Sequence, residues 1–183
     1  MRPALADLLD LQPHPEGGWY RQTWVAPETV TLPDGRQRAT ATLVLFLLPA
    51  GESSAWHRVS SDEVWLAHHG SVTLELGGDG PAPGETTQVR LGPDLSGGEV
   101  AQAVVPARVW QRTVPVATDA LVSCLVSPGF DFSDFQLAAD GSGHEDEVPD
   151  GDGPQGGDDD VVRRAPAGPE DAPVDPSEPA NPA

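Results

Sequence analysis

The chain has 183 residues, enough for one domain of ordinary size with a hydrophobic core. Its formal net charge is −19, from 29 acidic and 10 basic residues, which argues against binding to nucleic acids or to anionic membranes. A single cysteine, Cys124, excludes a disulfide framework within the chain. Because the chain opens without a signal-peptide pattern and no apolar run approaches the ~20 residues that span a bilayer, we expect a cytoplasmic protein.

The negative charge is concentrated at the end of the chain. Residues 140–183 hold 13 acidic residues and 2 arginines, a net charge of −11, together with eight prolines, seven glycines and no aromatic residue. Such a segment cannot bury enough apolar surface to offset the entropy of ordering it. We therefore predict one folded domain at residues 1–139 and a disordered acidic tail at residues 140–183.

The predicted domain begins with a short helix over residues 3–11, where Pro3 suits the first turn and Leu5, Leu8 and Leu9 fall on one face. Short apolar or alternating runs follow, separated by turn signals, and residues 28–38 are predicted as the end of a hairpin. Many short strands at regular spacing indicate an all-β sandwich or barrel. The predicted strands cover residues 19–25, 38–48, 54–58, 63–68, 71–76, 86–91, 99–105, 109–114 and 120–127.

The most informative stretch is residues 51–70, which has glycine at both ends. His57 comes six residues after Gly51, and Glu63 comes six residues after His57. An imidazole and a carboxylate that converge inside a barrel can act as acid and base, with Glu63 orienting His57, or can bind a first-row divalent metal. The alternative is a polar barrel interior in which the two side chains only hydrogen-bond each other.

This spacing resembles the first motif of the cupin superfamily, with Val59 at the position of its second histidine. Residues 104–111 resemble the second cupin motif, with Arg108 in place of a glycine and Gln111 in place of the metal-binding histidine. Two of the four usual metal ligands are therefore missing. A site for Fe, Mn, Ni or Zn would have to consist of His57 and Glu63, with Gln111 as a weak third ligand. The resemblance implies a small jelly-roll barrel that forms homodimers.

Four motifs over residues 5–138 are similar to one subgroup, the RmlC-like cupins of largely unknown function. They are His14-Pro-Glu-Gly-Gly18, His57 to Trp65, Val104 to Gln111, and Pro128 to Phe135. The resemblance implies isomerase, epimerase or lyase chemistry, with His57 or Glu63 abstracting a proton. Short helices at both ends of the barrel complete the expected fold, since Phe132 and Phe135 are one helical turn apart and can cover a barrel end.

The loop at residues 12–18 is the second candidate site, because two prolines and two glycines hold it in a fixed shape. Glu16 can accept hydrogen bonds from hydroxyl groups or an amine, and Arg21 can bind a carboxylate or phosphate. His14 and Tyr20 belong to the same candidate. The alternative is a loop whose polar groups only cap the backbone, but the family resemblance favours a role for Glu16 in a pocket.

Four tryptophans are expected to line the barrel or to pack its core: Trp19, Trp56, Trp65 and Trp110. His68 and His69 follow Glu63 on one predicted strand, where alternation turns His68 away from the interior and leaves His69 at the rim.

Taken together, these patterns predict a cavity lined by Trp65, His57, Glu63 and Gln111. We expect this cavity to bind a small polar metabolite that is either sugar-like or an intermediate of secondary metabolism. The alternatives are a metal-dependent cupin oxygenase and a non-catalytic binding protein.

Overall fold

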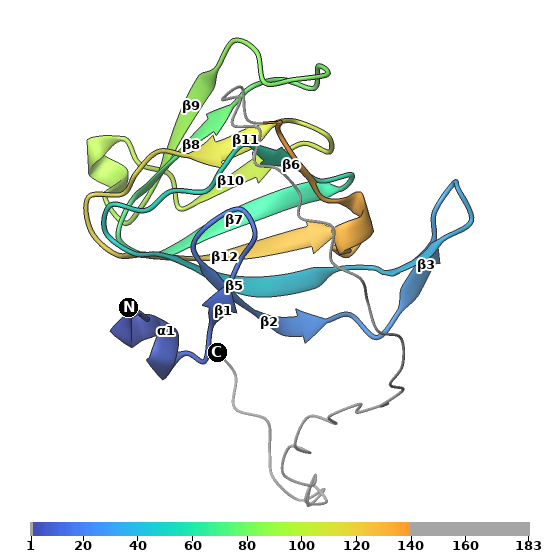
Figure 1. Ribbon diagram of the computed structural model, residues 1–183, viewed down its shortest axis with the longest axis horizontal. Coiled ribbons are helices and arrows are strands. Elements are labelled where there is room, and N and C mark those ends of the chain that lie inside the picture. The colour runs from blue at the N-terminus through green and yellow to red at the C-terminus, as the bar shows by residue number, and fades with distance from the viewer. Residues whose placement is uncertain (1, 140–183) are drawn as a thin grey trace, which may run out of the picture. The chain divides into compact units, whose positions relative to one another are not determined.

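The computed structural model describes residues 2–139, which form two facing antiparallel sheets and a small separate hairpin (Figure 1). This arrangement is the all-β barrel that the strand pattern predicted, and it has the jelly-roll form that the cupin resemblance implied. The predicted disordered tail, residues 140–183, lies outside the described residues. None of the helices within residues 2–139 has the length and apolarity needed to cross a membrane.

The larger sheet has six strands in the order β1-β2-β5-β12-β7-β10, and the smaller has five in the order β13-β6-β11-β8-β9. The larger sheet is built from β1 (Gln12–Pro13), β2 (Trp19–Val25), β5 (Thr42–Leu48), β12 (Ala120–Ser127), β7 (Asp62–His69) and β10 (Gln102–Val105). The smaller contains β13 (Gln136–Leu137), β6 (His57–Arg58), β11 (Gln111–Thr113), β8 (Val72–Leu76) and β9 (Thr87–Leu91). The hairpin pairs β3 (Thr29–Thr31) with β4 (Gln37–Ala39).

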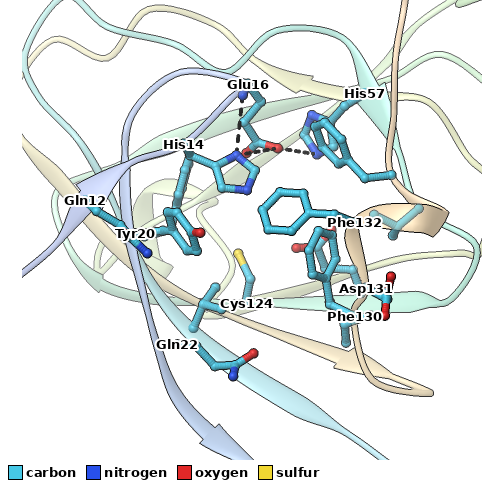
Figure 2. A pocket seen from close by; sticks show the side chains of 16 residues that line it. Gln12, His14, Glu16, Tyr20, Gln22, His57, Cys124, Phe130, Asp131 and Phe132 are labelled. Carbon is cyan, nitrogen blue, oxygen red and sulfur yellow. Dashed lines mark hydrogen bonds and ion pairs between the residues drawn. The ribbon is translucent and has the colours of Figure 1, made fainter. Parts of the chain in front are cut away.

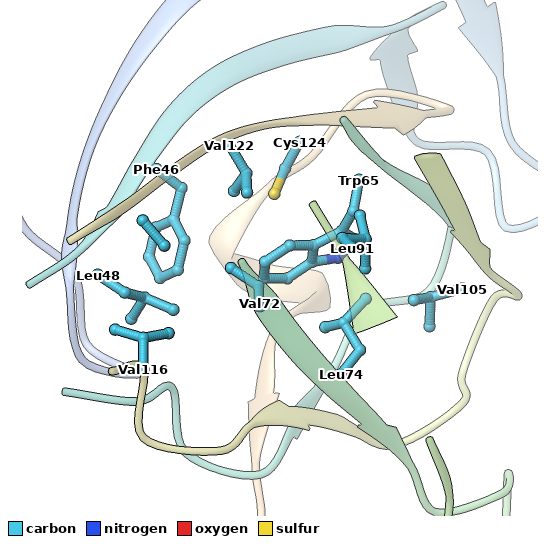
Figure 3. Packing of buried hydrophobic residues seen from close by; sticks show 11 residues of the cluster. Phe46, Leu48, Trp65, Val72, Leu74, Leu91, Val105, Val116, Val122 and Cys124 are labelled. Atoms are coloured by element: carbon cyan, nitrogen blue, oxygen red, sulfur yellow. The ribbon is translucent and has the colours of Figure 1, made fainter. Parts of the chain in front are cut away.

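The hydrophobic core fills one part of the space between the two sheets (Figure 3). Strands β5 and β12 pair over their whole length, from Ala120 opposite Leu48 to Val126 opposite Thr42. Alternation along each strand sends every second side chain inward, where Trp65 packs edge-on against Phe46 at 5.9 Å between ring centroids. The core therefore ends at Phe46, and the remaining space beyond it is the cavity described below.

A second, smaller cluster covers the outer face of the larger sheet. The helix α1 (Ala4–Leu8) and Leu11 bury Ala6 against Leu47, whose side chain points away from the barrel interior. The helix is shorter than the predicted residues 3–11, because Asp10 adopts a positive φ of 52° and the chain turns there. This contact fixes the start of the loop that follows, which carries part of the candidate site.

Two predicted strands are shorter in the structure because their backbones bond elsewhere. In the predicted strand 54–58, Ser54 N–H donates to the Thr113 hydroxyl and Ala55 N–H donates to the Glu16 carbonyl, so only β6 remains in the sheet ladder. In 109–114, a turn at residues 106–109 and a bond from Trp110 N–H to the Gly78 carbonyl leave only β11. The predicted strand 38–48 is interrupted before Thr42, and its first residues belong to the hairpin.

Two single-turn 3₁₀ helices complete the described residues: η1 (Leu95–Gly97) and η2 (Phe132–Asp134). In η2, the Asp131 carboxylate accepts a hydrogen bond from Ser133 N–H and caps the turn. This turn corresponds to the short C-terminal helix expected from the spacing of Phe132 and Phe135.

Candidate functional site

A cavity of about 480 Å³ opens between the sheets on the far side of Phe46 from the core (Figure 2). Its volume falls in the range of ~300–1,000 Å³ that is usual for small-molecule sites. Strands β2, β5, β6, β7 and β12 supply its walls, together with the loop before β2 and the segment around η2. The lining residues are Gln12, His14, Glu16, Tyr20, Gln22, Val44, Phe46, His57, Val59, Glu63, Cys124, Val126, Phe130, Asp131, Phe132 and Phe135.

The loop that carries His14 and Glu16 has a shape that only glycine permits at two positions. Gly17 has a φ of +104°, and a Cβ atom there would lie 2.7 Å from the carbonyl oxygen of Ser53. Gly18 has a φ of +70°, and its Cβ would lie 2.8 Å from the carbonyl oxygen of Leu47. The loop therefore sits directly against β5 and the segment that precedes β6, and its Glu16 side chain is buried inside the barrel.

The Glu16 carboxyl group lies between two histidine rings. Its Oε2 is 3.2 Å from Nε2 of His57 and 3.4 Å from Nδ1 of His14. All three side chains are at least 90% shielded from solvent, since the exposed fractions of Glu16, His57 and His14 are 8%, 3% and 10% respectively. We name His14, Glu16 and His57 the carboxyl–histidine trio.

The other hydrogen bonds of the two rings assign their tautomers. Nδ1 of His57 lies 2.9 Å from the Ala55 carbonyl, which can only accept, so in the neutral ring Nδ1 carries the hydrogen and Nε2 does not. Nδ1 of His14 accepts from Glu16 N–H at 3.4 Å, so its ring hydrogen is on Nε2. Two bare ring nitrogens therefore face one carboxyl oxygen, and a proton is required among these three atoms to make the contacts favourable.

Burial favours the carboxyl group, rather than either imidazole, as the site of this proton. Burial lowers the pKa of His57 to about 4 and lowers the pKa of His14 to about 4 as well. Burial also raises the pKa of Glu16 well above its ordinary value, and the nearby Glu63 carboxyl raises it further. The trio thus presents a carboxylic acid beside two neutral imidazoles.

Glu63 lies in the same cavity but has different partners. Its Oε2 accepts a 2.5 Å hydrogen bond from Nε2 of Gln111, and Oε1 of Gln111 accepts one from the indole of Trp65 at 3.1 Å. Burial raises the pKa of Glu63, and the hydrogen bond from Gln111 opposes that rise. The prediction that Glu63 orients His57 is not what the structure shows, because the loop at residues 14–18 places Glu16 next to the His57 ring instead.

Aromatic rings pack directly against the two histidines of the trio. Phe135 stacks on His57 with 5.6 Å between centroids and 28° between planes, and Phe132 stacks on His14 at 5.9 Å and 27°. Tyr20 meets His14 edge-on at 4.7 Å. Since Phe132 is 50% exposed, the segment 130–135 forms both the wall and the mouth of the cavity.

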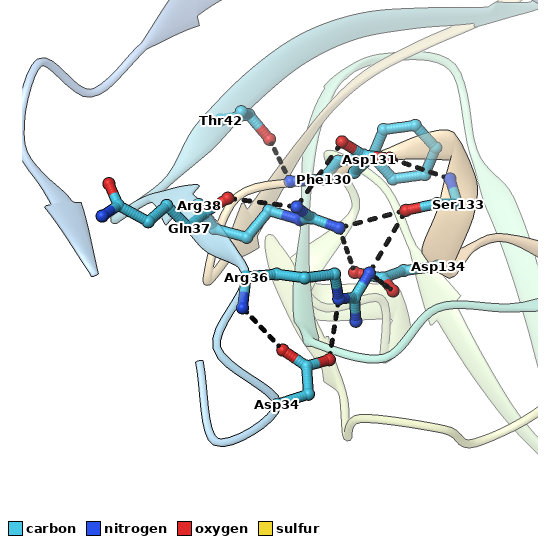
Figure 4. A network of polar contacts seen from close by, with 9 residues as sticks. All are labelled: Asp34, Arg36, Gln37, Arg38, Thr42, Phe130, Asp131, Ser133 and Asp134. Carbon is cyan, nitrogen blue, oxygen red and sulfur yellow. Dashed lines mark hydrogen bonds and ion pairs between the residues drawn. The ribbon is translucent and has the colours of Figure 1, made fainter. Parts of the chain in front are cut away.

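Two arginines of the hairpin hold this segment in place (Figure 4). Arg36 donates to the Asp134 carboxylate at 2.6 Å, and Arg38 donates to the same carboxylate at 3.0 Å. Both guanidinium groups also bond to the Ser133 hydroxyl. Among the described residues, the buried Nε of Arg38 has no hydrogen-bond partner. The buried charge of Arg38 is therefore stabilised mainly by the Asp134 carboxylate and the Ser133 hydroxyl.

We expect Asp134→Asn to loosen residues 130–135, because the substitution removes the charge that two arginines share. Hydrogen–deuterium exchange of peptides covering these residues should rise about tenfold, with a loss of about 1 kcal/mol in unfolding free energy. Asp34→Asn is the matched control, since Asp34 contacts Arg36 alone and lies outside the cavity wall. Equal exchange in the two variants would show that the arginines do not hold the segment.

The remaining predicted site residues lie outside the cavity. Arg21 is exposed and faces away from the barrel, because Tyr20 and Gln22 occupy the inward positions on either side of it. Trp110 is buried elsewhere: its indole donates to the Gly80 carbonyl at 2.9 Å, and Arg58 stacks on its ring at 4.5 Å. Trp65 and Gln111 lie behind Glu63 rather than on the cavity surface.

The outer tryptophans and the paired histidines are also away from the site. Trp19 packs under Arg2, and Trp56 packs under Arg112. His68 and His69 are exposed, and the His68 ring contacts the Ser123 hydroxyl at 2.6 Å on the outer face of the sheet. Both histidines therefore lie outside the cavity, which is consistent with the prediction from strand alternation.

The proposed metal ligands His57, Glu63 and Gln111 do not fit a metal ion. The amide oxygen of Gln111 accepts the indole hydrogen of buried Trp65 and its amide nitrogen donates to Glu63, so both ends of this side chain are directed at protein partners. Val59, at the position of a second histidine, presents only hydrocarbon. Within residues 2–139, no group of three or more His, Cys, Asp or Glu side chains is arranged to hold a metal ion.

Sequence reasoning did not place several cavity residues in the site. Gln22 shares the inward face of β2 with Tyr20, and the alternation of that strand was a usable signal. Phe46 and Cys124 lie in apolar runs typical of a buried strand, which give no sign of where the core ends and a cavity begins. Phe132 and Phe135 were expected at a barrel end, without a choice between packing and ligand contact.

Comparison with known proteins agrees with the fold and with the order of these elements. A family described as "Cupin superfamily (DUF985)" matches residues 4–138. A hypothetical protein from Leishmania major is 32% identical, with 74% of this chain and 86% of that chain covered and a TM-score of 0.65. A Shewanella oneidensis protein is 35% identical, with coverage of 75% and 85% and a TM-score of 0.64.

More distant structures share the fold alone. A Bacillus subtilis oxalate decarboxylase is 15% identical, with 70% of this chain and 30% of that chain covered and a TM-score of 0.51. No curated protein matches the sequence. The jelly-roll topology, the family match over residues 4–138 and the two structures above 30% identity together show that this chain belongs to the cupin superfamily, in the family described as DUF985.

Proposed function

We propose that this cupin binds a small polar metabolite in its cavity and transfers a proton to or from it, as an isomerase, epimerase or lyase does. The observation that carries the proposal is the Glu16 carboxyl group, buried within 3.4 Å of two ring nitrogens that both lack a hydrogen. A protonated carboxyl and a neutral imidazole in one cavity are the two partners that general acid–base catalysis needs.

Each member of the site has a distinct role in this proposal. Glu16 donates its proton to a substrate oxygen, and His57 accepts a proton from an adjacent carbon or hydroxyl group. The bond from Nδ1 of His57 to the Ala55 carbonyl keeps Nε2 free to accept. Glu63 is the second carboxyl group facing the substrate, and Gln111 fixes its position. The aromatic wall of Phe132 and Phe135 shields the reacting groups from water.

Solvent-isotope exchange tests this function whatever the identity of the product. The protein is incubated in D₂O with a library of cyclic sugars, hydroxyketones and related polar metabolites, and each compound is weighed by mass spectrometry. Abstraction of a C–H proton adds about one mass unit to the compound that fits the site. The expected result is exchange by the wild-type protein that disappears in His57→Gln. Absence of exchange in every bound compound would contradict proton transfer at carbon.

Two alternatives make different predictions. A metal-dependent oxygenase would contain about one equivalent of Fe, Mn, Ni or Zn, which Glu63→Ala would release, and elemental analysis of the purified protein measures this directly. A non-catalytic binding protein would retain its ligand without exchange and would tolerate His57→Gln. We favour proton transfer because the partners of Gln111 conflict with the metal set, and simple binding does not require a buried acid between two bases.

The homodimer and the cytoplasmic location stay predictions. Within residues 2–139, apolar side chains are exposed near both ends of the larger sheet. Trp24 is 45% exposed on β2, beside the two-residue edge strand β1, and Val104 is 58% exposed on the edge strand β10. Exposed apolar residues at sheet edges are compatible with association but do not require it.

A further inference from the structure

The charge of the cavity limits what can bind there. Three acidic side chains line it, from Glu16, Glu63 and Asp131, and within residues 2–139 no arginine lines it. The chain contains no lysine at all. The guanidinium groups of Arg36 and Arg38 pair with the carboxylates of Asp34, Asp131 and Asp134 and do not line the cavity.

The two histidines do not supply the missing positive charge. Their low pKa keeps both rings neutral near pH 7, and each bare nitrogen faces Glu16. Asp131 remains ionised at the mouth, because the hydrogen bonds from Ser133 lower the pKa of its carboxyl group. A phosphate or carboxylate ligand would therefore be desolvated beside other carboxyl groups without a counter-ion, which disfavours its binding strongly.

The walls favour a ring. Phe132 stacks on His14 and Phe135 stacks on His57, while Phe46 and Tyr20 meet His14 edge-on, so apolar ring faces and edges surround the cavity. Apolar faces of this kind suit the C–H face of a sugar-like ring or a planar ring. The Tyr20 hydroxyl and the amides of Gln12 and Gln22 make no side-chain hydrogen bond to another described residue, so they are free to bond to ligand hydroxyl groups (Figure 2).

We infer that the cavity selects an uncharged, hydroxyl-bearing ring compound and rejects phosphorylated or carboxylated forms of the same ring. This inference deepens the proposed function, on which it rests for the location of the site. It does not depend on the chemistry that follows binding. Nucleotide sugars, sugar phosphates and sugar acids are accordingly excluded as substrates, whereas neutral sugars and cyclic hydroxyketones are retained.

The single cysteine of the chain makes the selectivity measurable before any ligand is identified. Cys124 lines the cavity, so a thiol reagent has to enter the cavity to modify it. Two methanethiosulfonates of similar size serve as probes, one with a neutral hydroxyethyl group and one with an anionic sulfonatoethyl group. We expect the anionic probe to react at least about tenfold more slowly than the neutral probe, after correction for their rates with free cysteine.

A matched control separates the cavity from the general negative charge of the protein. In the Cys124→Ser background, Ala82→Cys places the only thiol on an exposed loop, where we expect the two probes to differ by no more than about threefold. Gln22→Arg introduces a cation at the cavity wall, and this change should raise the relative rate of the anionic probe at Cys124 about tenfold.

Each outcome decides the inference independently of catalysis. Equal or faster modification of Cys124 by the anionic probe would overturn it. Burial raises the pKa of the Cys124 thiol and slows its reaction with both probes, so the ratio of the two rates is the deciding quantity. Charge selectivity without any isotope exchange would support the ligand class while contradicting proton transfer. Isotope exchange on a phosphorylated compound would confirm the chemistry and overturn the ligand class.

Discussion

Glu16→Gln is expected to lower solvent-isotope exchange by about 10²–10⁴-fold while leaving the fold intact. The amide has nearly the same shape as the carboxylic acid and can still donate to Nε2 of His57, but it has no proton to transfer. The measurement is the exchange rate of the compound identified in the library. Glu85→Gln, an exposed change of the same charge outside the cavity, is the control and should retain the wild-type rate.

The same variant should become sensitive to acid, and the sign follows from proton linkage. Between pH 4 and 6.5 the unfolded chain binds a proton on His57 that the folded state does not, so this group lowers stability as the pH falls. Glu16 acts in the opposite direction, because its folded-state pKa is raised and the folded state keeps a proton that the unfolded state releases above its ordinary pKa of 4.5. In the wild-type protein the two contributions oppose each other.

Removal of Glu16 leaves the histidine contribution without this opposition. From pH 7 to pH 5 the unfolding free energy of Glu16→Gln should fall by about 2 kcal/mol more than that of the wild-type protein. Urea denaturation at both pH values measures this difference. Parallel pH profiles for the two proteins would contradict the assignment of the shared proton to Glu16. Of the other groups that face the trio, Glu63 and Cys124 interact electrostatically with Glu16, so their pKa values also change in the variant and contribute to the difference.

The second large effect is expected from Gly17→Ala. A side chain here meets the Ser53 carbonyl oxygen at 2.7 Å, and the φ of +104° is unfavourable for alanine, so we expect a loss of about 3 kcal/mol or more in unfolding free energy. The bond from Ala55 N–H to the Glu16 carbonyl, 2.7 Å long, ties the loop to the same backbone segment. Relief of the clash therefore moves Glu16 away from His57 and also removes activity.

Gly35→Ala is the matched control for backbone strain alone. Gly35 has a φ of +88° in the hairpin turn, and a Cβ atom there would have no neighbour within 4 Å. We expect it to cost about 1 kcal/mol and to leave the cavity unchanged. Urea denaturation gives both free energies, and the NMR signal of the His57 ring reports whether the trio is intact. Equal stability of the two variants would show that Gly17 is not required for close packing of the 14–18 loop against Ser53.

The strands that the sequence predicted best are those whose pairing is continuous. Residues 19–25 and 120–127 form β2 and β12 with the predicted bounds, because alternation or a long apolar run marks them and partners bond along their length. Residues 54–58 were predicted less well. Their polar backbone atoms bond to Thr113 and Glu16, which are distant in the chain.

The candidate site was likewise predicted only in part. Spacing and resemblance were enough to name His57, Glu63 and Glu16 as candidates, and all three line one cavity. They were not enough to assign partners: Gln111, expected to hold a metal, instead bonds to Glu63 and Trp65. An amide at that position is compatible with either role, and only its neighbours in space distinguish between them.

Local sequence patterns were sufficient to establish that the described part of this protein is an all-β cupin, because period-two alternation, turn residues and motif spacing are local properties of the chain. Which polar groups meet depends instead on the packed fold. The loop at residues 14–18 can reach His57 only after two glycines let it pack against Leu47 and Ser53, about 30 residues further along the chain. Burial there sets the protonation of the carboxyl–histidine trio. Partner choice and protonation depend on contacts between distant residues, so they follow from the fold rather than from any local pattern.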